Sequence, residues 1–419
     1  MSLAIGARRR LGLFGQGPFA VYWTGGFLSN VGTWLQAVAG SVFVYDRTGS
    51  AFAVGILNFA TFIPIVLFSL PGGVISDRFD RRAVVIVTQV ISGFLGLALA
   101  IFMFAGIATE VHVIVTAFLL QTSWAIAKPS LTAMLNALVT REELTQAVGL
   151  NTLQFMTGQL VGPLLATLVL ATAGYPWAFA INAATFLAPI LAMVYLYRRG
   201  LAGSVETAAA RLLRQGQSIT AYVRSQPWIA FVLVAVVVTS GIAEVIRTTA
   251  PVLVTERLGA PSSDAGLIIA AQSFGYVAGI LAFTALRRRD LARPIASFGL
   301  VLQGLGLLVA SAATEMPVAA VGVAAIGMGF ALCLPVVTAV LQSEAPEQMR
   351  GRLMSLHQIA LLGNRPFTAL AAGALAATFG VPVALIAATV LVPIGLLAAR
   401  AVWRGVGAQS TTVSAQVIP

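Results

Sequence analysis

Charged residues are scarce in this chain. Only 9% of its 419 residues are Asp, Glu, Lys or Arg, whereas soluble domains average about 25%. Hydrophobic residues make up 58% of the chain, with 40 glycines and 18 prolines dispersed among them. Transmembrane helices tolerate glycine and proline better than soluble helices do. This composition excludes a soluble globular protein and indicates helices that cross a membrane.

Residues that carry out chemistry are also few. The chain has two histidines, one cysteine (Cys333) and a single lysine (Lys128), so an intrachain disulfide is excluded. No H-E-x-x-H or G-x-S-x-G motif occurs, and Ala127 before Lys128 rules out a phosphate-binding loop. We therefore predict no enzyme activity, no cofactor and no metal site, which leaves an intramembrane enzyme as the less favoured class.

Apolar runs long enough to cross the hydrocarbon core, about 20 residues each, occur twelve times. They lie at residues 20–45, 51–75, 82–106, 111–138, 145–173, 177–197, 227–255, 263–286, 294–313, 317–343, 352–377 and 381–403. The long polar gap divides the chain into a first half (1–197), a cytoplasmic loop (198–226) and a second half (227–404). We predict that the Ser/Thr-rich tail (405–419) is disordered. Two halves of six spans are the layout of many secondary transporters.

Basic residues are distributed unevenly between the two ends of these spans. With the N-terminus inside, twenty of the 25 basic residues fall on the cytoplasmic side, and only Arg47 and Arg257 fall outside. Positive charge is retained on the cytoplasmic side of membranes, so both termini are predicted to be cytoplasmic. The net charge of +11 is then explained by orientation in the bilayer, and we predict no nucleic-acid partner.

A short charged hinge, residues 72–82, follows the second span. Residues 73–82, Gly-Val-Ile-Ser-Asp-Arg-Phe-Asp-Arg-Arg, resemble the signature G-x-L-A-D-R-x-G-R-K of the major facilitator superfamily, with Asp80 where the family usually has glycine. The branch with the enterobactin exporter and the macrolide-efflux proteins is resembled at residues 22–25, 29–34, 45–50, 141–144 and 350–355. The resemblance implies an all-α membrane protein with the major facilitator fold.

The hinge is expected to act as a gate. The resemblance implies that Asp77 meets the start of span eleven, near Gly351 and Arg352, and holds the cytoplasmic ends of the halves together in the outward-open state. A loop that only sets topology is the alternative. The residues assigned to the gate are Gly73, Asp77, Arg78, Arg81 and Arg82.

Span five carries Gly158, Gly162 and Pro163. This stretch is similar to the antiporter motif G-x-x-x-G-P-x-x-G-G, although Ala166 and Thr167 replace its last two glycines. In the family the motif accompanies efflux, so it favours export. Small residues four apart also allow two helices to approach closely, and packing alone remains the alternative.

Several polar side chains lie near the middle of predicted spans, where transporters bind substrate. A charge at the centre of a bilayer costs about 2.5–3.5 kcal/mol unless it faces protein or water. The resemblance implies that spans one, four, seven and ten line a central cavity. The residues predicted to bind substrate are Asn30, Trp34, Gln121, Trp124, Lys128, Arg247, Asn364 and Arg365. A purely local pair between Glu244 and Arg247 remains the alternative for span seven.

Three cations and one acid give these spans a positive interior, which suits an anionic substrate. Glu244 is our candidate for the proton carrier, with His357 as the second choice. We predict a secondary active transporter that exports a siderophore, antibiotic or other anionic metabolite by alternating access, coupled to protons as in drug:proton antiporters. It is expected to be a multi-pass monomer in the lipid bilayer of the bacterial cytoplasmic membrane. An importer or a lipid flippase of the same fold is the alternative.

Overall fold

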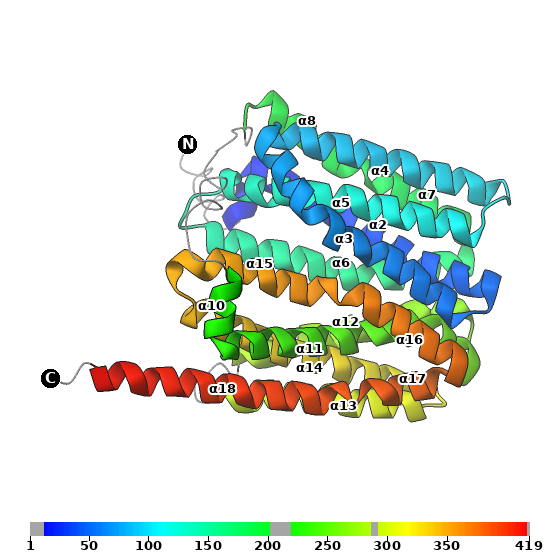
Figure 1. The fold of residues 1–419 in the computed structure, drawn as a ribbon. Helices are drawn as coiled ribbons and strands as arrows, with labels where there is room; N and C mark the ends of the chain where they lie inside the picture. The colour runs from blue at the N-terminus through cyan, green and yellow to red at the C-terminus, as the bar shows by residue number, and fades with distance from the viewer. Residues whose placement is uncertain (1–11, 202–218, 286–291, 417–419) are drawn as a thin grey trace. The chain divides into compact units, whose positions relative to one another are not determined.

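The computed structural model describes residues 12–201, 219–285 and 292–416, and every regular element in these ranges is a helix (Figure 1). In chain order the elements are η1 (Gly12–Gly15), α2 (Gly17–Thr48), α3 (Ala51–Arg78), α4 (Arg81–Phe104), α5 (Glu110–Leu138), α6 (Leu144–Thr172), α7 (Tyr175–Thr185), α8 (Leu187–Arg198), α10 (Ile219–Ser225), α11 (Pro227–Val252), η2 (Leu253–Arg257), η3 (Ser262–Asp264), α12 (Ala265–Ala285), α13 (Ala292–Ala312), α14 (Met316–Glu344), α15 (Glu347–Gly363), α16 (Arg365–Phe379), α17 (Val381–Ala388) and α18 (Leu391–Gln416).

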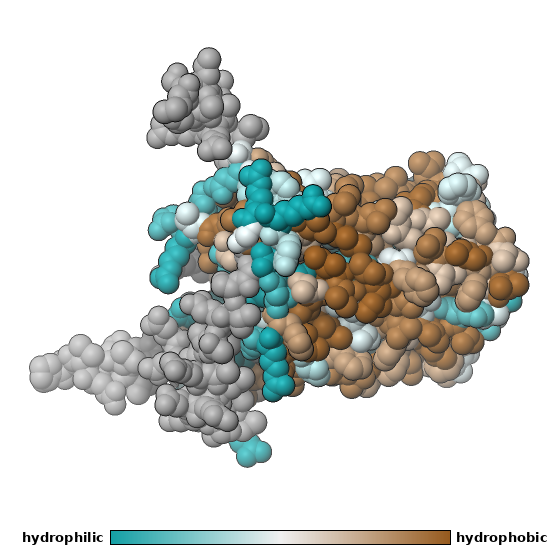
Figure 2. All heavy atoms as spheres, turned by 90° about the horizontal axis from the view of Figure 1, so that it is seen from above, coloured by the Kyte–Doolittle hydropathy of each residue, from teal (hydrophilic) through white to brown (hydrophobic). Residues whose placement is uncertain are grey.

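Within the described ranges, 12 helical segments are long and apolar enough to cross a membrane. Several of them are interrupted, so that α7 with α8, α15 with α16 and α17 with α18 each form one span. Large apolar side chains lie exposed on their surfaces, including Leu70, Phe94 and Leu191. Figure 2 shows this apolar surface, with hydrophilic side chains gathered toward one set of helix ends. The predicted all-α membrane fold with twelve spans is confirmed.

The chain divides into two compact units. Unit 1 comprises Met1–Gly49 and Ala60–Arg214, and unit 2 comprises Ser50–Phe59 and Gln215–Pro419. Helix α3 therefore contributes its first turns to unit 2, where Asn58 donates a buried hydrogen bond to Thr248 of α11 (3.3 Å). Residues 50–59 thus belong to unit 2, although they lie within the predicted first half of the chain.

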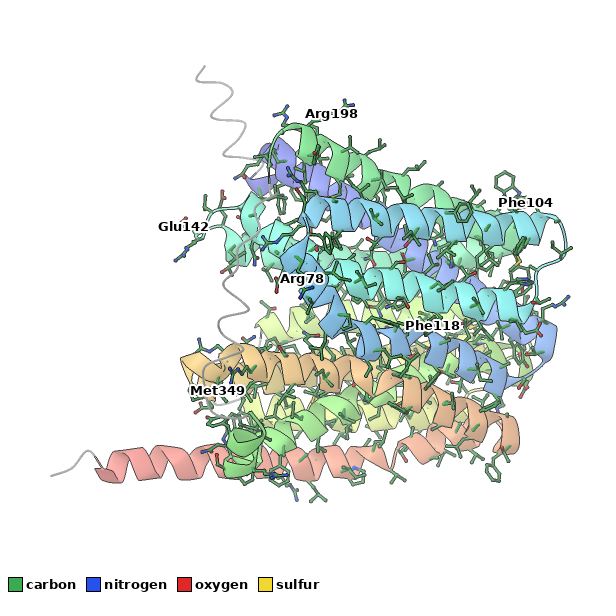
Figure 3. All side chains as sticks on the ribbon, turned by 45° about the horizontal axis from the view of Figure 1, so that its top comes forward. Arg78, Phe104, Phe118, Glu142, Arg198 and Met349 are labelled. Carbon is green, nitrogen blue, oxygen red and sulfur yellow. The ribbon has the colours of Figure 1, made fainter. Side chains whose placement is uncertain are left out.

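One end of unit 1 is held by a hydrophobic cluster. Phe19 and Tyr22 of α2 pack with Met134 of α5 and Leu196 of α8, all of them buried. The Tyr22 hydroxyl donates to the backbone carbonyl of Leu131 (3.0 Å), so the buried phenol is satisfied. Figure 3 shows Arg78 at the end of α3, Arg198 at the end of α8 and Glu142 in the turn between α5 and α6, all on one side of unit 1, with Phe104 at the opposite side.

The two units share one local turn. Gly174 precedes α7 with φ 80°, and Gly380 precedes α17 with φ 84°. Each is followed two residues later by a proline in the first turn of the helix, a position that tolerates the missing N–H. Side chains strongly disfavour this backbone region, so glycine is needed at both places. The same turn thus opens the sixth and the twelfth span, as expected for repeated halves.

Two predicted segments can be compared with the structure in part. Helix α18 continues to Gln416, beyond the predicted end of span twelve at residue 403, and the disorder predicted for residues 405–419 stays a prediction. Adding a residue to an existing helix requires no new nucleation, which favours continuation of span twelve. The predicted loop 198–226 contains the short helix α10, and its residues 202–218 lie outside the described ranges.

Candidate functional site

A basic and aromatic face lies on α5 in unit 1. The Nζ of Lys128 lies 5.3 Å from the centre of the Trp124 ring, in a cation–π contact between residues one helical turn apart. Lys128 is exposed, whereas Trp124 and Gln121 are half-buried. Because a lysine within a span is costly in hydrocarbon, we expect Lys128 to face water or polar groups rather than lipid.

Helix α3 approaches α5 closely at this face. A Cβ atom at Gly72 would lie 2.8 Å from the carbonyl oxygen of Ala125 and 2.9 Å from the Cα of Ile126. Pro129 follows four residues after Ala125 and has no N–H to donate to that carbonyl. Gly72 therefore permits the hinge to lie directly against the turn that carries Trp124 and Lys128.

Helices α2 and α6 meet at the glycines of the antiporter-type motif. A Cβ at Gly158 would clash with Nδ2 of Asn30, and one at Gly162 would lie 2.5 Å from the Cβ of Trp34. The Asn30 amide donates to the carbonyls of Gln154 and Phe155, each at 3.2 Å.

The buried Pro163 follows Gly162, and Trp34 packs edge-on against Phe155 at 5.9 Å between ring centres. Asn30, Trp34 and the two glycines thus lie where α2 packs against α6, and their predicted roles in substrate binding and antiport stay predictions.

The hinge after α3 is stabilised by an ion pair that the signature does not contain. Asp80 is the N-cap of α4, and its carboxylate accepts hydrogen bonds from the backbone N–H (2.8 Å), Nε (3.1 Å) and Nη2 (2.7 Å) of Arg82. The Arg82 guanidinium also donates to the carbonyl of Leu201 and lies 4.7 Å from the centre of the Tyr197 ring. These contacts tie the start of α4 to the end of α8.

The other hinge residues lie at the same junction. Asp77 and Arg78 end α3, and Arg81 begins α4. Gly73 differs from Gly72, because nothing lies within 4 Å of a Cβ built there. The partner expected for Asp77 near Gly351 and Arg352 belongs to unit 2, and this gate contact stays a prediction.

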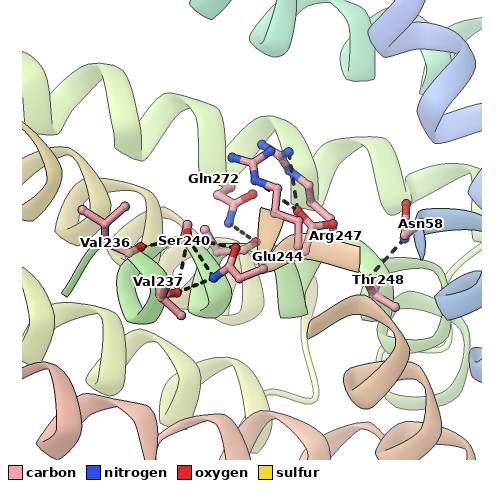
Figure 4. Close-up of polar contacts among 11 residues, drawn as sticks. Asn58, Val236, Val237, Ser240, Glu244, Arg247, Thr248 and Gln272 are labelled. Atoms are coloured by element: carbon pink, nitrogen blue, oxygen red, sulfur yellow. Dashed lines mark hydrogen bonds and ion pairs between the residues drawn. The ribbon is translucent and has the colours of Figure 1, made fainter. Parts of the chain in front are cut away.

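In unit 2 an acid lies between two arginines (Figure 4). Oε2 of Glu244 on α11 lies 3.8 Å from Nη1 of Arg247 and 3.9 Å from Nε of Arg365 on α16. Glu244 is 1% exposed, and the side chains of Arg247 and Arg365 are 11% and 13% exposed. The local pair considered from the sequence is therefore part of a larger cluster with a net charge of +1.

A break between α15 and α16 places Arg365 beside Glu244. Pro366, in the first turn of α16, has no N–H to continue the preceding helix. The amide of Asn364, at the break, donates to the carbonyl of Val237 (2.6 Å) and to the hydroxyl of Ser240 (3.0 Å). Asn364 thus fixes the break against α11, while the next residue contributes its charge to the cluster.

His357, the second candidate for the proton carrier, lies elsewhere in unit 2. It is 3% exposed and shares a hydrogen bond of 2.9 Å between its Nε2 and the hydroxyl of Thr338 on α14. This contact joins α14 to α15.

Sequence reasoning missed two features of these sites. The pairing of Arg365 with Glu244 joins residues from different spans, and no local sequence pattern predicts it. The role of Asp80 had a readable signal, because aspartate is a preferred N-cap and lies just before the arginines that begin α4.

Comparison with known families and proteins gives consistent matches. The family model described as transmembrane secretion effector matches residues 10–415. The multidrug efflux pump Tap of Mycobacterium tuberculosis is 26% identical over 382 residues, which cover 87% of this chain and 88% of that protein. The enterobactin exporter EntS of Shigella flexneri is 31% identical over 175 residues, or 40% of this chain.

The staphyloferrin A transporter of Staphylococcus aureus is 26% identical over 177 residues, or 42% of this chain. The chain spans less than half the length of these last two relatives, 42% of EntS and 45% of the staphyloferrin A transporter.

Solved structures share the fold at low sequence identity. A bacterial homologue of the iron transporter ferroportin has a TM-score of 0.73 and 15% identity, over 93% of this chain and 98% of its own. A bacterial homologue of the human lysosomal transporter Spinster has a TM-score of 0.71 and 13% identity, over 93% and 97% of the two chains. Both likenesses bear on the fold alone.

Proposed function

Because the chain belongs to the transmembrane secretion effector family of the major facilitator superfamily, we propose that it exports a small organic anion by alternating access. It is a multi-pass membrane transporter and not an enzyme. We place the protein in the bacterial cytoplasmic membrane, as a monomer with both termini cytoplasmic.

The observation that carries the proposal is the excess of positive charge on the polar faces within the spans. In unit 2, Arg247 and Arg365 share one acid, and in unit 1 the exposed Lys128 lies beside an aromatic ring. Guanidinium groups bind oxyanions with directed hydrogen bonds, and lysine adds a point charge. Each of the two polar faces could therefore bind an anion, and in unit 1 the ring of Trp124 adds an apolar surface beside Lys128.

Export is favoured over import by the relatives. Two of them are named as an enterobactin exporter and a multidrug efflux pump, so a siderophore or an antibiotic is the candidate substrate. The antiporter-type motif at Gly158, Gly162 and Pro163 supports the same direction. Uptake into inside-out vesicles, compared with right-side-out vesicles, distinguishes export from import, and a flippase would instead move a labelled lipid between leaflets.

Proton coupling is proposed to pass through Glu244. Its carboxyl group is buried between α11 and α16, and a carboxyl group held away from water can exchange a proton as its surroundings change. Its position beside Arg247 and Arg365 would couple its protonation directly to occupation of the cationic site.

The test is transport of benzenesulfonate by the purified protein in vesicles. We expect Arg365→Ala to lower counterflow about 30-fold or more, since loss of one partner in a buried charge pair costs about 2–5 kcal/mol. Lys128→Ala should lower it less, because Lys128 is exposed. Arg257→Ala is the matched control, because Arg257 is an exposed arginine at the end of η2. Unchanged counterflow in both variants, with the protein inserted normally, would refute an anion site at these residues.

A further inference from the structure

Arg247 and Arg365 lie beside Glu244 at ion-pair distances rather than at those of short hydrogen bonds. Their distances to Oε2, 3.8 Å and 3.9 Å, are well beyond the roughly 2.7–2.9 Å of a charge-assisted hydrogen bond. Oε1 accepts no hydrogen bond from any described residue, although Glu244 is 1% exposed. A buried carboxylate is normally fully hydrogen-bonded. Glu244 therefore occupies this cationic site with incomplete coordination.

We infer that Glu244 is the internal counter-ion of an oxyanion site, and that an organic anion binds at Arg247 and Arg365 together with a proton taken up by Glu244. The inference deepens the proposed function and rests on it. While Glu244 is ionised, it neutralises one of the two guanidiniums and repels an incoming anion. Protonation removes both effects, so the site becomes more positive by one charge and the neutral acid can donate a hydrogen bond to the ligand.

Thermodynamic linkage makes this coupling reciprocal. If a proton on Glu244 strengthens anion binding, then the anion strengthens proton binding by the same factor. The two species would be carried in the same direction through this site. That outcome differs from the exchange favoured by the antiporter-type motif. The driving force for an anion of two or more negative charges would then be the inside-negative membrane potential, because the complex still carries net negative charge outward.

Few other titratable groups lie on the helices that pack against α11. Helix α12 faces α11 with Gln272, whose amide donates to the carbonyl of Ala243 (2.9 Å). Helices α13, α17 and α18, which also pack against α11, contain no acid, lysine or histidine. Other acids, tyrosines, cysteines and histidines on the elements packed against α11 are Tyr222 on α10, Glu256 on η2, Asp264 on η3, Tyr276 on α12, Cys333 on α14 and His357 on α15. Acidic residues of α14 and α15 lie at helix ends, at Glu344 and Glu347.

The experiment measures proton uptake during ligand binding to the purified full-length protein. The probe is benzenesulfonate, whose charge does not change with pH, and the neutral control of similar shape is benzenesulfonamide. Calorimetric titration in buffers of different ionisation enthalpy counts the protons taken up. We expect uptake approaching one proton per benzenesulfonate, affinity that rises as pH falls, and no uptake with the sulfonamide.

Two variants assign the proton. Glu244→Gln should bind benzenesulfonate about tenfold more tightly at alkaline pH, a coupling of ordinary size, with no uptake and no pH dependence. His357→Gln should keep the uptake of the wild type. Glu244→Gln could fail to fold, because two buried guanidiniums would lack their acid. In that case the number of protons taken up by the wild type and by His357→Gln still tests whether binding is coupled to a proton and whether His357 carries it.

Each outcome has a definite meaning. Binding without proton uptake, weaker binding by Glu244→Gln, or loss of uptake in His357→Gln would overturn the internal counter-ion while leaving an anion site in place. Absence of benzenesulfonate binding in the wild type and Glu244→Gln alike would overturn the proposed anionic substrate together with this inference.

Discussion

Asp80 shows how a departure from a family signature can have a local structural reason. Glycine is usual at that position, yet here the side chain caps α4 and pairs with Arg82, which in turn contacts Leu201. The hydrogen bonds from Arg82 lower the pKa of Asp80. The folded state therefore binds the proton more weakly than the unfolded state does, and the stabilisation from Asp80 is lost as pH falls through the lowered pKa.

Substitutions at Asp80 should separate the contribution of its N-cap to stability from that of its ion pair with Arg82. Asp80→Ala is expected to destabilise the protein by about 1 kcal/mol, the usual loss for an N-cap. Asp80→Asn keeps a good cap and loses only the ion pair of a partly exposed carboxylate, so its effect should be smaller. Thermal unfolding in detergent at neutral and acidic pH measures this, and the difference between wild type and Asp80→Ala should shrink in acid. A difference that is independent of pH would contradict the role of the charge.

At the scale of elements, helix α6 offers a controlled comparison of glycines. Gly158→Ala and Gly162→Ala introduce a methyl group against α2, and at Gly162 it also meets backbone, the carbonyl of Val31 at 2.8 Å. Overpacking of this kind costs about 1–3 kcal/mol, and we expect the larger loss at Gly162. Gly149→Ala, on the same helix with nothing within 4 Å, should instead stabilise by about 0.5–1 kcal/mol.

Thermal unfolding of the three variants provides the measurement. Equal stability of all three would mean that α2 and α6 are not closely packed at this motif. A variant of normal stability that loses transport would support an additional role for Gly158 or Gly162 in the transport cycle.

The spans could be predicted from the sequence, but their interruptions could not. Hydropathy and length locate a span because the bilayer imposes both. The break at Asn364 depends on Pro366 and on hydrogen bonds to α11, and a proline alone does not produce it, since Pro163 lies inside an unbroken α6. The Glu244 cluster was predicted only as far as its local partner, because Arg365 reaches it through tertiary packing.

At the scale of the whole molecule, the orientation in the membrane is a prediction that can be measured. In a Cys333→Ala background, Arg257→Cys should react with a membrane-impermeant maleimide in intact cells, while Arg141→Cys should react only after the membrane is opened. Both arginines are exposed, one at the end of η2 and the other between α5 and α6. Labelling of Arg141→Cys in intact cells would invert the topology derived from the positive charges.

The division of α3 between the units has a consequence for any attempt to produce the halves of this transporter as separate polypeptides. A cut in the central loop would leave residues 50–59 on the fragment that contains unit 1, although they belong to unit 2. The second fragment would then lack Asn58, the partner of Thr248, and the small residue Gly55 that packs on Gly373. The core of the second fragment would be complete only after the first fragment supplied residues 50–59. Assembly of such a split transporter would therefore require the start of helix α3 to insert into unit 2.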